Sequence, residues 1–158
     1  MSSRMNALIR RYENGAGDLI ASVDGLSERD LDRRLAAGKW SIRQQVHHVA
    51  DAELNLVTRM KKILAEDNPL LIAFDQEKWA DKFSRSGPSI ENSIALFYTL
   101  RASMTPILKG LKDADFERTG IHNESGKVTL AGVLEHTVEH FENHLNTIER
   151  IKRKHKIR

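Results

Sequence analysis

The sequence predicts an all-α fold, a four-helix bundle, and three observations favour it. Apolar residues recur at helical spacing along four long segments, and no stretch of any length alternates as a half-buried strand would. The chain has 158 residues, 40% of them hydrophobic and 30% charged, which is the size and make-up of one globular domain. It contains neither internal repeats nor low-complexity linkers, so we expect a single domain over residues 1–158.

The first half of the chain predicts two long helices separated by a short one. Residues 6–23 carry a helical apolar stripe that two glycines weaken. Ser27 precedes two acids of a first turn and is expected to cap a short helix that ends before Gly38. Ser41 is expected to cap the second long helix, which the Asn-Pro pair at 68–69 stops.

The second half predicts two further long helices joined by irregular segments. Residues 69–88 are expected to form a connection with one helical turn at most. The third helix starts at Ser89, is kinked or broken at Pro106 and ends at Gly110. After a second irregular stretch, the fourth helix begins near Thr129 and runs into the basic end of the chain.

The basic end, residues 150–158, holds six cations and no acid. Since the whole chain has a formal charge of +3, everything before this tail is slightly acidic. Cations are favourable at the carboxyl end of a helix, where the macrodipole is negative. No aromatic residue interleaves with the tail to stack on bases, so we expect this role and not nucleic-acid binding.

Composition excludes several classes of chemistry. The chain has no cysteine, which rules out disulfides, thiolate metal ligands and an internal thiol nucleophile. The amino terminus lacks the apolar run of a signal peptide, and no apolar stretch is long enough to cross a bilayer. We therefore expect a soluble, cytoplasmic protein without membrane contact.

Histidines are the main indication of function. His136, His140 and His144 lie at successive turns of the fourth helix, and the pair His47-His48 lies in the second. Two of them, His140 and His144, replace apolar residues on the face that should be buried, where an unsatisfied polar group costs roughly 1–3 kcal/mol. Imidazoles four residues apart on a helix can share one metal ion. The pattern predicts a metal site.

The spacing also indicates which histidines share the ion. His136 and His144 are separated by about 12 Å along the helix axis, too far for one small ion, so only an adjacent pair can serve. His144 continues the inner stripe and His136 leaves it, which favours His140 with His144 and puts His136 at the surface or behind the ligands. From the second helix, His48 is preferred over His47.

Polar and aromatic neighbours leave alternatives open. Gln44 and Asn55 lie on nearly the same face as His48, where they indicate either a wet pocket or an exposed polar strip. Trp40 and Trp79 could form the wall of a pocket near the ion, but packing at the end of the bundle explains them as well and is the first expectation.

Other metal-site patterns fit less well. Di-iron bundles need Glu-x-x-His pairs on facing helices, and no glutamate here has a histidine three residues on. The segment from His136 to His140, with Glu139 between them, matches the H-x-x-E-H pattern of inverted zinc proteases. Nothing in the sequence supplies a strand edge to hold an extended peptide, which disfavours a protease.

One long run and several later positions resemble the DinB/YfiT family of four-helix metalloproteins. The matching residues are Gly38-Lys39-Trp40-Ser41-Ile42-Arg43-Gln44-Gln45-Val46-His47-His48-Val49-Ala50-Asp51, Asn55, Arg59, Asn68-Pro69 and Asp75 to Trp79. The resemblance implies ligands at His48, His140 and His144, one divalent ion, usually zinc or nickel, often a homodimer, and helices that run up, down, down and up. It also implies kinship with bacillithiol S-transferases and, more distantly, with mycothiol-dependent maleylpyruvate isomerases. Glu139 and Asn143 depart from the residues that precede the late ligands in YfiT relatives, so substrate and thiol identity do not transfer.

Three neutral imidazoles leave a divalent ion with an open position, the arrangement of catalytic sites. A coordinated water would give a hydrolase and a coordinated thiol a transferase. Because the chain has no cysteine, the thiol would be an external low-molecular-weight one, and we expect its transfer to an electrophilic small molecule first. Asp51, Asn55 and Glu139 are candidates to orient a ligand or move a proton, although solvated helix faces explain them equally. A metal-dependent hydrolase and a non-catalytic metal-binding stress-response module remain as alternatives.

Overall fold

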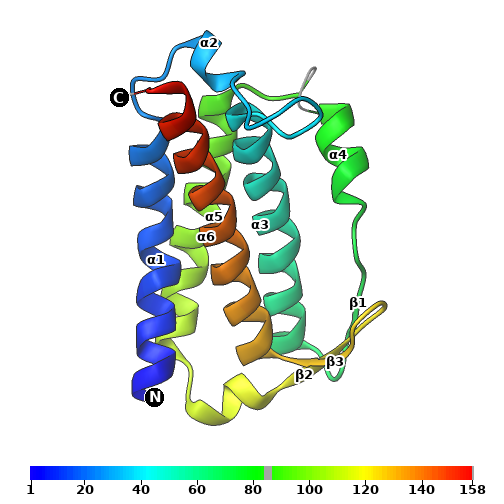
Figure 1. Cartoon of the computed structure of the whole chain (residues 1–158). Helices are drawn as coiled ribbons and strands as arrows, with labels where there is room; N and C mark the ends of the chain where they lie inside the picture. The colour runs from blue at the N-terminus through cyan, green and yellow to red at the C-terminus, as the bar shows by residue number, and fades with distance from the viewer. Residues whose placement is uncertain (84–86, 158) are drawn as a thin grey trace.

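Four long helices pack side by side in the computed structural model, which describes residues 1–83 and 87–157 (Figure 1). They are α1 (Ser3–Val23), α3 (Ile42–Ala65), α5 (Ile90–Gly110) and α6 (Leu130–His155). With the amino terminus at the bottom of Figure 1, α1 runs up, α3 and α5 run down, and α6 runs up. The predicted all-α bundle with up-down-down-up topology is confirmed.

Helix starts agree with the caps expected from the sequence. The hydroxyl of Ser41 accepts from the amide of Gln44, whose side chain accepts from the Ser41 amide, a reciprocal capping box. Ser27 caps the short helix α2 (Glu28–Leu31), and Thr129 caps α6. Each of these caps satisfies an amide that would otherwise lack a partner at the helix start.

Proline does not break the third long helix. Pro106 lies inside α5, which continues to Gly110, so of the two expected outcomes, a kink or a break, the break is wrong. Met104 and Leu108, on either side of the proline, are both fully buried. Their packing in the core holds the helix together where one backbone hydrogen bond is lost.

A long crossover joins α3 to α5. Because both helices run down, the chain must return over the full length of the bundle between them (Figure 1). It does so through strand β1 (Leu70–Leu71) and helix α4 (Gln76–Phe83), which is longer than the single turn expected. Trp79 of α4 packs against Phe74 and Phe83 with ring centroids 4.9 and 5.9 Å apart.

A small sheet lies at the base of the bundle and corrects the expectation of no strands. β1 pairs in parallel with β2 (Thr119–His122), which pairs antiparallel with β3 (Gly126–Thr129), after the 3-10 helix η1 (Asp113–Glu117). Strands of two and four residues are too short to show an alternating pattern, which is why the sequence hid them. The sheet packs on the bundle at Gly120, where an added Cβ would lie 3.1 Å from Ile63 Cγ1 of α3.

A charged group lies in the middle of the apolar core. Arg101 of α5 and Glu53 of α3 are 1% and 2% exposed and form an ion pair of 3.1 Å. The Tyr12 hydroxyl donates to the other Glu53 oxygen at 2.6 Å, and Arg101 Nη1 donates to the Tyr12 carbonyl at 2.8 Å. We call these three residues the buried ion-pair cluster. It ties α1, α3 and α5 together.

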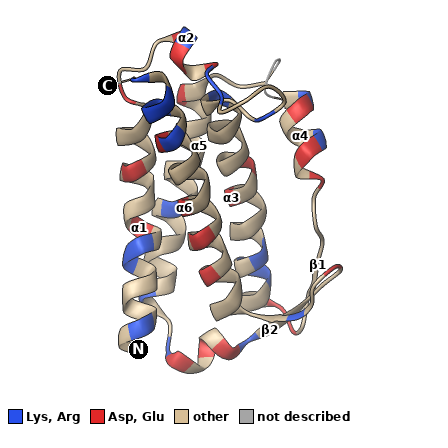
Figure 2. Ribbon diagram, viewed as in Figure 1, with Lys and Arg blue, Asp and Glu red and all other residues tan. Residues whose placement is uncertain are grey.

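The basic residues of the tail gather at the carboxyl end of α6 (Figure 2). Lys152 Nζ donates to the Ser22 carbonyl at 2.9 Å, Lys154 donates to the Leu35 carbonyl, and His155 Nε2 donates to the Arg34 carbonyl at 2.9 Å. The last residue of the tail, at position 158, lies outside the described residues. In the described ranges, every helix is too short or too polar to span a membrane.

Candidate metal centre

Three histidine side chains converge between α3 and α6. His48 Nε2 lies 3.0 Å from His140 Nε2, which lies 3.2 Å from His144 Nε2. One ligand atom from each of the three residues falls within 4.8 Å of the others. We call His48, His140 and His144 the histidine triad. The one-turn spacing of the two α6 residues puts both rings on the face that packs on α3.

The triad is held in its neutral form by burial. Burial, and then the two neighbouring imidazoles, lowers the pKa of His48 to about 3. Burial also lowers the pKa of His140 to about 3 and that of His144 to about 4. Neutral imidazoles present a lone pair at pH 7, which is the state that binds a metal ion.

Gln45 fixes the orientation of one triad ring. His144 Nδ1 lies 2.5 Å from Gln45 Oε1. Because that amide oxygen can only accept, Nδ1 carries the proton and the lone pair is on Nε2, which faces His140. Gln45 is buried on α3, one turn before His48. Helix α3 therefore supplies one triad ring, His48, and also the side chain that orients a second one, His144.

Trp40 covers the triad from the side of α2. Its ring lies 4.7 Å from that of His48, centroid to centroid, and stacks on His144 at 6.1 Å and 18°. Of the two alternatives expected for this tryptophan, the structure shows the pocket wall and not the packing that was expected first. Trp79 packs against Phe74 and Phe83, as described above.

The donor set fits a divalent cation with nitrogen ligands. Zinc–imidazole bonds of about 2.0–2.1 Å in tetrahedral geometry separate two ligand nitrogens by about 3.3 Å. The nitrogen separations of 3.0 and 3.2 Å are close to that value. Three imidazoles leave at least one coordination position for another ligand, as in catalytic and not closed structural sites.

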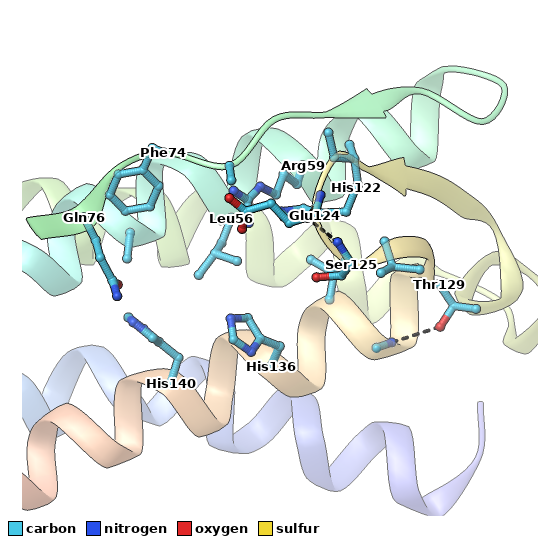
Figure 3. A pocket seen from close by; sticks show the side chains of 16 residues that line it. Leu56, Arg59, Phe74, Gln76, His122, Glu124, Ser125, Thr129, His136 and His140 are labelled. Carbon is cyan, nitrogen blue, oxygen red and sulfur yellow. Dashed lines mark hydrogen bonds between the residues drawn. The ribbon is translucent and has the colours of Figure 1, made fainter.

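Two hollows meet at the triad. The first, of about 580 Å³, reaches His140 and is shown in Figure 3. It is lined by Ala52, Leu56, Arg59, Leu71, Ala73, Phe74, Gln76, His122, Glu124, Ser125, Val128, Thr129, Gly132, Val133, His136 and His140. The second, of about 690 Å³, reaches His140 and His144. It is lined by Leu35, Ala36, Gly38, Lys39, Trp40, Gln45, Gln76, Glu77, His140, His144, Thr147 and Arg150.

The other two histidines singled out by the sequence lie apart from the triad. His47 is buried and its Nδ1 bonds to Ser93 Oγ at 2.7 Å, toward α5. His136 is exposed, with its ring 5.8 Å from that of His140, and it lines the first hollow. The structure thus brings His48 and His144 together with His140, and it places His47 and His136 outside this group.

The polar candidates near the triad are placed differently from the histidines. Neither hollow is lined by Asp51, Asn55 or Glu139. Asn55 Nδ2 donates to the Asp51 carbonyl at 2.8 Å, Glu139 is exposed, and burial raises the pKa of Asp51. The Gln44 side chain accepts from the Ser41 amide in the capping box. The catalytic roles of Asp51, Asn55 and Glu139 stay predictions.

Sequence reasoning missed Gln45 and Gln76 as parts of the site. Gln45 could have been found, because it precedes His48 by three residues on the same helix face. Gln76, at the start of α4, lines both hollows, but only the path of the crossover brings it there.

Comparisons with known proteins agree with this architecture. Two proteins of Oceanobacillus iheyensis, both named "Putative metal-dependent hydrolase", are 31% and 32% identical over 141 and 144 residues. Each alignment covers 89% of this chain, and 79% and 83% of the two relatives. The solved structure of YfiT from Bacillus subtilis, described as "a probable metal-dependent hydrolase with an unusual four-helix bundle topology", superposes with a TM-score of 0.91. The sequences are 27% identical, and the match covers 99% of this chain and 90% of that one. The DinB superfamily model matches residues 11–148, and the chain therefore belongs to the DinB superfamily.

Proposed function

We propose that this protein is a metal-dependent enzyme in which His48, His140 and His144 hold one divalent cation. The convergence of three neutral imidazole nitrogens beside two hollows carries the proposal. The names of the two relatives and of YfiT support metal dependence. Imidazole ligands suit zinc and nickel, which we propose as the candidates to test first.

A cation held by the triad would supply Lewis acidity, lowering the pKa of a coordinated water or thiol so that it becomes a nucleophile near neutral pH. The residues of the chain prepare that position. Gln45 holds His144 with the lone pair of its Nε2 facing His140. The Trp40 ring covers His48 and His144 from one side. Burial keeps all three rings unprotonated.

Transfer of a low-molecular-weight thiol to an electrophilic small molecule is the reaction that we propose first. The two hollows support it, since a transferase needs room for two organic substrates next to the same ion. The thiol sulfur bonds to the electrophilic carbon, the leaving group departs with the bonding electron pair, and the thiol proton goes to solvent. No cysteine of the chain can replace the external thiol.

Hydrolysis is the second candidate, because the relatives and YfiT carry that description in their names. A water oxygen would then bond to the carbonyl carbon of an ester or amide, and the acyl C–O or C–N bond would break. The alcohol or amine would leave with one proton of the water, and the other proton would stay with the acid product. In that case one hollow holds the substrate and the other admits water. A metal-binding module without turnover is the third candidate, and a homodimer is a separate proposal that light scattering tests.

The ligand assignment is tested by single substitutions and metal analysis. His48→Ala, His140→Ala and His144→Ala are expected to lose the bound metal, measured by mass spectrometry after dialysis against zinc or nickel. His136→Ala is the matched control, because it removes an exposed imidazole one turn from His140 and is expected to keep full occupancy. Full occupancy in His144→Ala with loss in His136→Ala would move the site by one turn and refute the assignment.

The reaction is tested by a substrate screen on the metal-loaded protein. Thiols are paired with electrophilic acceptors in one arm, and esters and amides are offered without thiol in the other. Turnover that requires the thiol and disappears in His140→Ala supports transfer, whereas thiol-independent turnover supports hydrolysis. No turnover in either arm, together with a large loss of thermal stability on chelation, would favour the structural module.

A further inference from the structure

Arg59 stands out in the first hollow because part of its guanidinium has no partner. Its Nη2 donates to the Ile72 carbonyl at 2.9 Å. Its Nε is buried and is the one buried side-chain nitrogen or oxygen in residues 1–83 and 87–157 without a hydrogen-bond partner. An unsatisfied buried donor on a charged group costs more than the roughly 1–3 kcal/mol of a neutral one, so such a group indicates a missing acceptor.

One further donor, the His122 ring of β2, lies at the same end of the hollow. Figure 3 shows Arg59, His122 and Glu124 together on the side opposite His136 and His140. His122 Nδ1 accepts from the backbone amides of Glu124 and Ser125 at 3.3 and 3.2 Å, so its proton is on Nε2. Burial, and then the charge of Arg59, lowers the pKa of His122, which makes this ring a neutral donor.

Negative charge at this end is limited. Among the described residues that line the hollow, Glu124 is the one carboxylate, and it is exposed. Within the described ranges, no ion pair of 4.0 Å or less joins Arg59 to an acid. The guanidinium is therefore not neutralised by contact, although the field of Glu124 reaches it.

Apolar side chains form a large part of the wall of the first hollow. They include Leu56, Phe74 and Val133. Arg59 follows His48 by eleven residues on α3, an axial distance of about 16 Å, which is about three turns along the same helix face. A ligand that spans the hollow would have an apolar body and polar groups at both ends.

We propose that the Arg59 end of the first hollow is a carboxylate-binding subsite, and that the acceptor substrate is an organic acid with an apolar segment between its carboxylate and its reactive group. This inference rests on the proposed function and names its substrate class. One guanidinium with a neutral donor beside it matches a planar monoanion, which a guanidinium binds through two parallel N–H groups. A phosphate dianion would require more cations and would be repelled by Glu124.

The subsite is tested by calorimetry with 4-phenylbutyrate and its uncharged amide, 4-phenylbutyramide, on protein as purified and after treatment with EDTA. We expect the acid to bind about tenfold tighter than the amide. This affinity ratio corresponds to the net free energy of about one hydrogen bond between charged groups. Arg59→Met is expected to remove this preference. Lys127→Met is the matched control, because it removes one exposed cation from the β2–β3 hairpin, which carries His122 and Glu124, and lies outside the hollow. It should keep the preference.

Arg59→Met also removes the hydrogen bond to the Ile72 carbonyl and could disturb the fold locally. Two further measurements therefore test ligand binding with Arg59 in place. Glu124→Gln leaves Arg59 intact and is expected to tighten 4-phenylbutyrate binding severalfold by removing repulsion. In the NMR spectrum of the wild type, the Arg59 Nε–H resonance should shift on addition of 4-phenylbutyrate and not of the amide.

Three results would overturn the subsite: a preference for the acid that survives in Arg59→Met, an unmoved Nε–H resonance, or weaker binding in Glu124→Gln. A preference seen only before EDTA treatment would mean that the carboxylate binds a cation, which also refutes the subsite. These outcomes do not depend on metal occupancy in the triad variants, so failure of the subsite and failure of the proposed function are distinguishable.

Discussion

Removing Arg101 is expected to cost more stability than any exposed substitution in the protein. In Arg101→Met the guanidinium loses hydrogen bonds of 3.2 and 3.1 Å to Glu53 and one of 2.8 Å to the Tyr12 carbonyl. Its contacts with three aromatic rings, at 4.4–4.6 Å from the centroids of Tyr12, Phe97 and Phe141, are replaced by a flexible apolar chain. Glu53, 2% exposed, keeps only the Tyr12 hydroxyl.

The magnitude follows from the charge that is left behind. Breaking a buried ion pair by removing one partner typically costs about 3–5 kcal/mol, because the other charge stays desolvated without compensation. A domain of this size has an unfolding free energy of roughly 5–15 kcal/mol, so Arg101→Met loses a large fraction of it. A variant with no charge in the core, Tyr12→Phe/Glu53→Leu/Arg101→Met, is expected to recover most of the loss, since apolar residues of similar volume remove the desolvation cost.

The assay is urea unfolding in the presence of EDTA, so that metal binding does not contribute to stability. Arg11→Met is the control, because Arg11 forms an exposed ion pair of 2.6 Å with Glu142 and should lose no more than about 1 kcal/mol. An Arg101→Met variant within about 1 kcal/mol of the wild type, or a triple variant less stable than the single one, would refute the reasoning.

Three further predictions follow from the site and the core. The metal-free protein should lose stability as the pH falls below 6.5, because unfolded histidines take up protons there while the triad stays neutral until about pH 3–4. Three such groups give a slope of up to about 4 kcal/mol per pH unit, and unfolding free energies at pH 7, 6 and 5 check it, with a flat profile as the contradicting result. Gln45→Leu should weaken metal binding about 10–100-fold in a chelator competition while leaving the number of sites unchanged; unchanged affinity would mean that the hydrogen bond to the triad is dispensable. Gly15→Ala should destabilise the protein by about 1–3 kcal/mol, because its Cβ would overlap the Arg101 guanidinium and lie 2.9 Å from Phe141 Cε1. Gly17→Ala, on the same helix with open space around it, should instead stabilise by up to about 1 kcal/mol, and equal effects at both glycines would contradict the packing.

The long helices were predictable because local interactions determine them. Periodic apolar residues and a hydroxyl cap at the first turn act within a few residues of sequence, and the starts at Ser41 and Thr129 follow directly. The short strands were not predictable, because their partners are distant: Leu70 pairs with Ile121, and neither segment alone has a strand pattern. The length of α4 depends on the same long-range packing.

The triad could be anticipated because polar residues stood where the helix pattern required apolar ones. The same signal was present, and missed, for the buried ion-pair cluster. Glu53 lies between Val49 and Leu56 on the inner stripe of α3, and Arg101 lies between Phe97 and Met104 on that of α5. One charged residue of each sign at inner positions of two helices indicates a buried pair. What the sequence could not supply is which helices face each other.

Topology, more than local sequence, makes the triad accessible to two hollows. In an up-down-up-down bundle, short loops would join neighbouring helices and leave the outer surface of α3 and α6 uncovered. Here α3 and α5 run in the same direction, so the chain must climb back outside the bundle (Figure 1). That segment places Phe74 over the first hollow and Gln76 between the two. The crossover therefore supplies part of the walls of both hollows, and α3, α6, the β2–β3 hairpin and the segment that precedes α3 supply the rest.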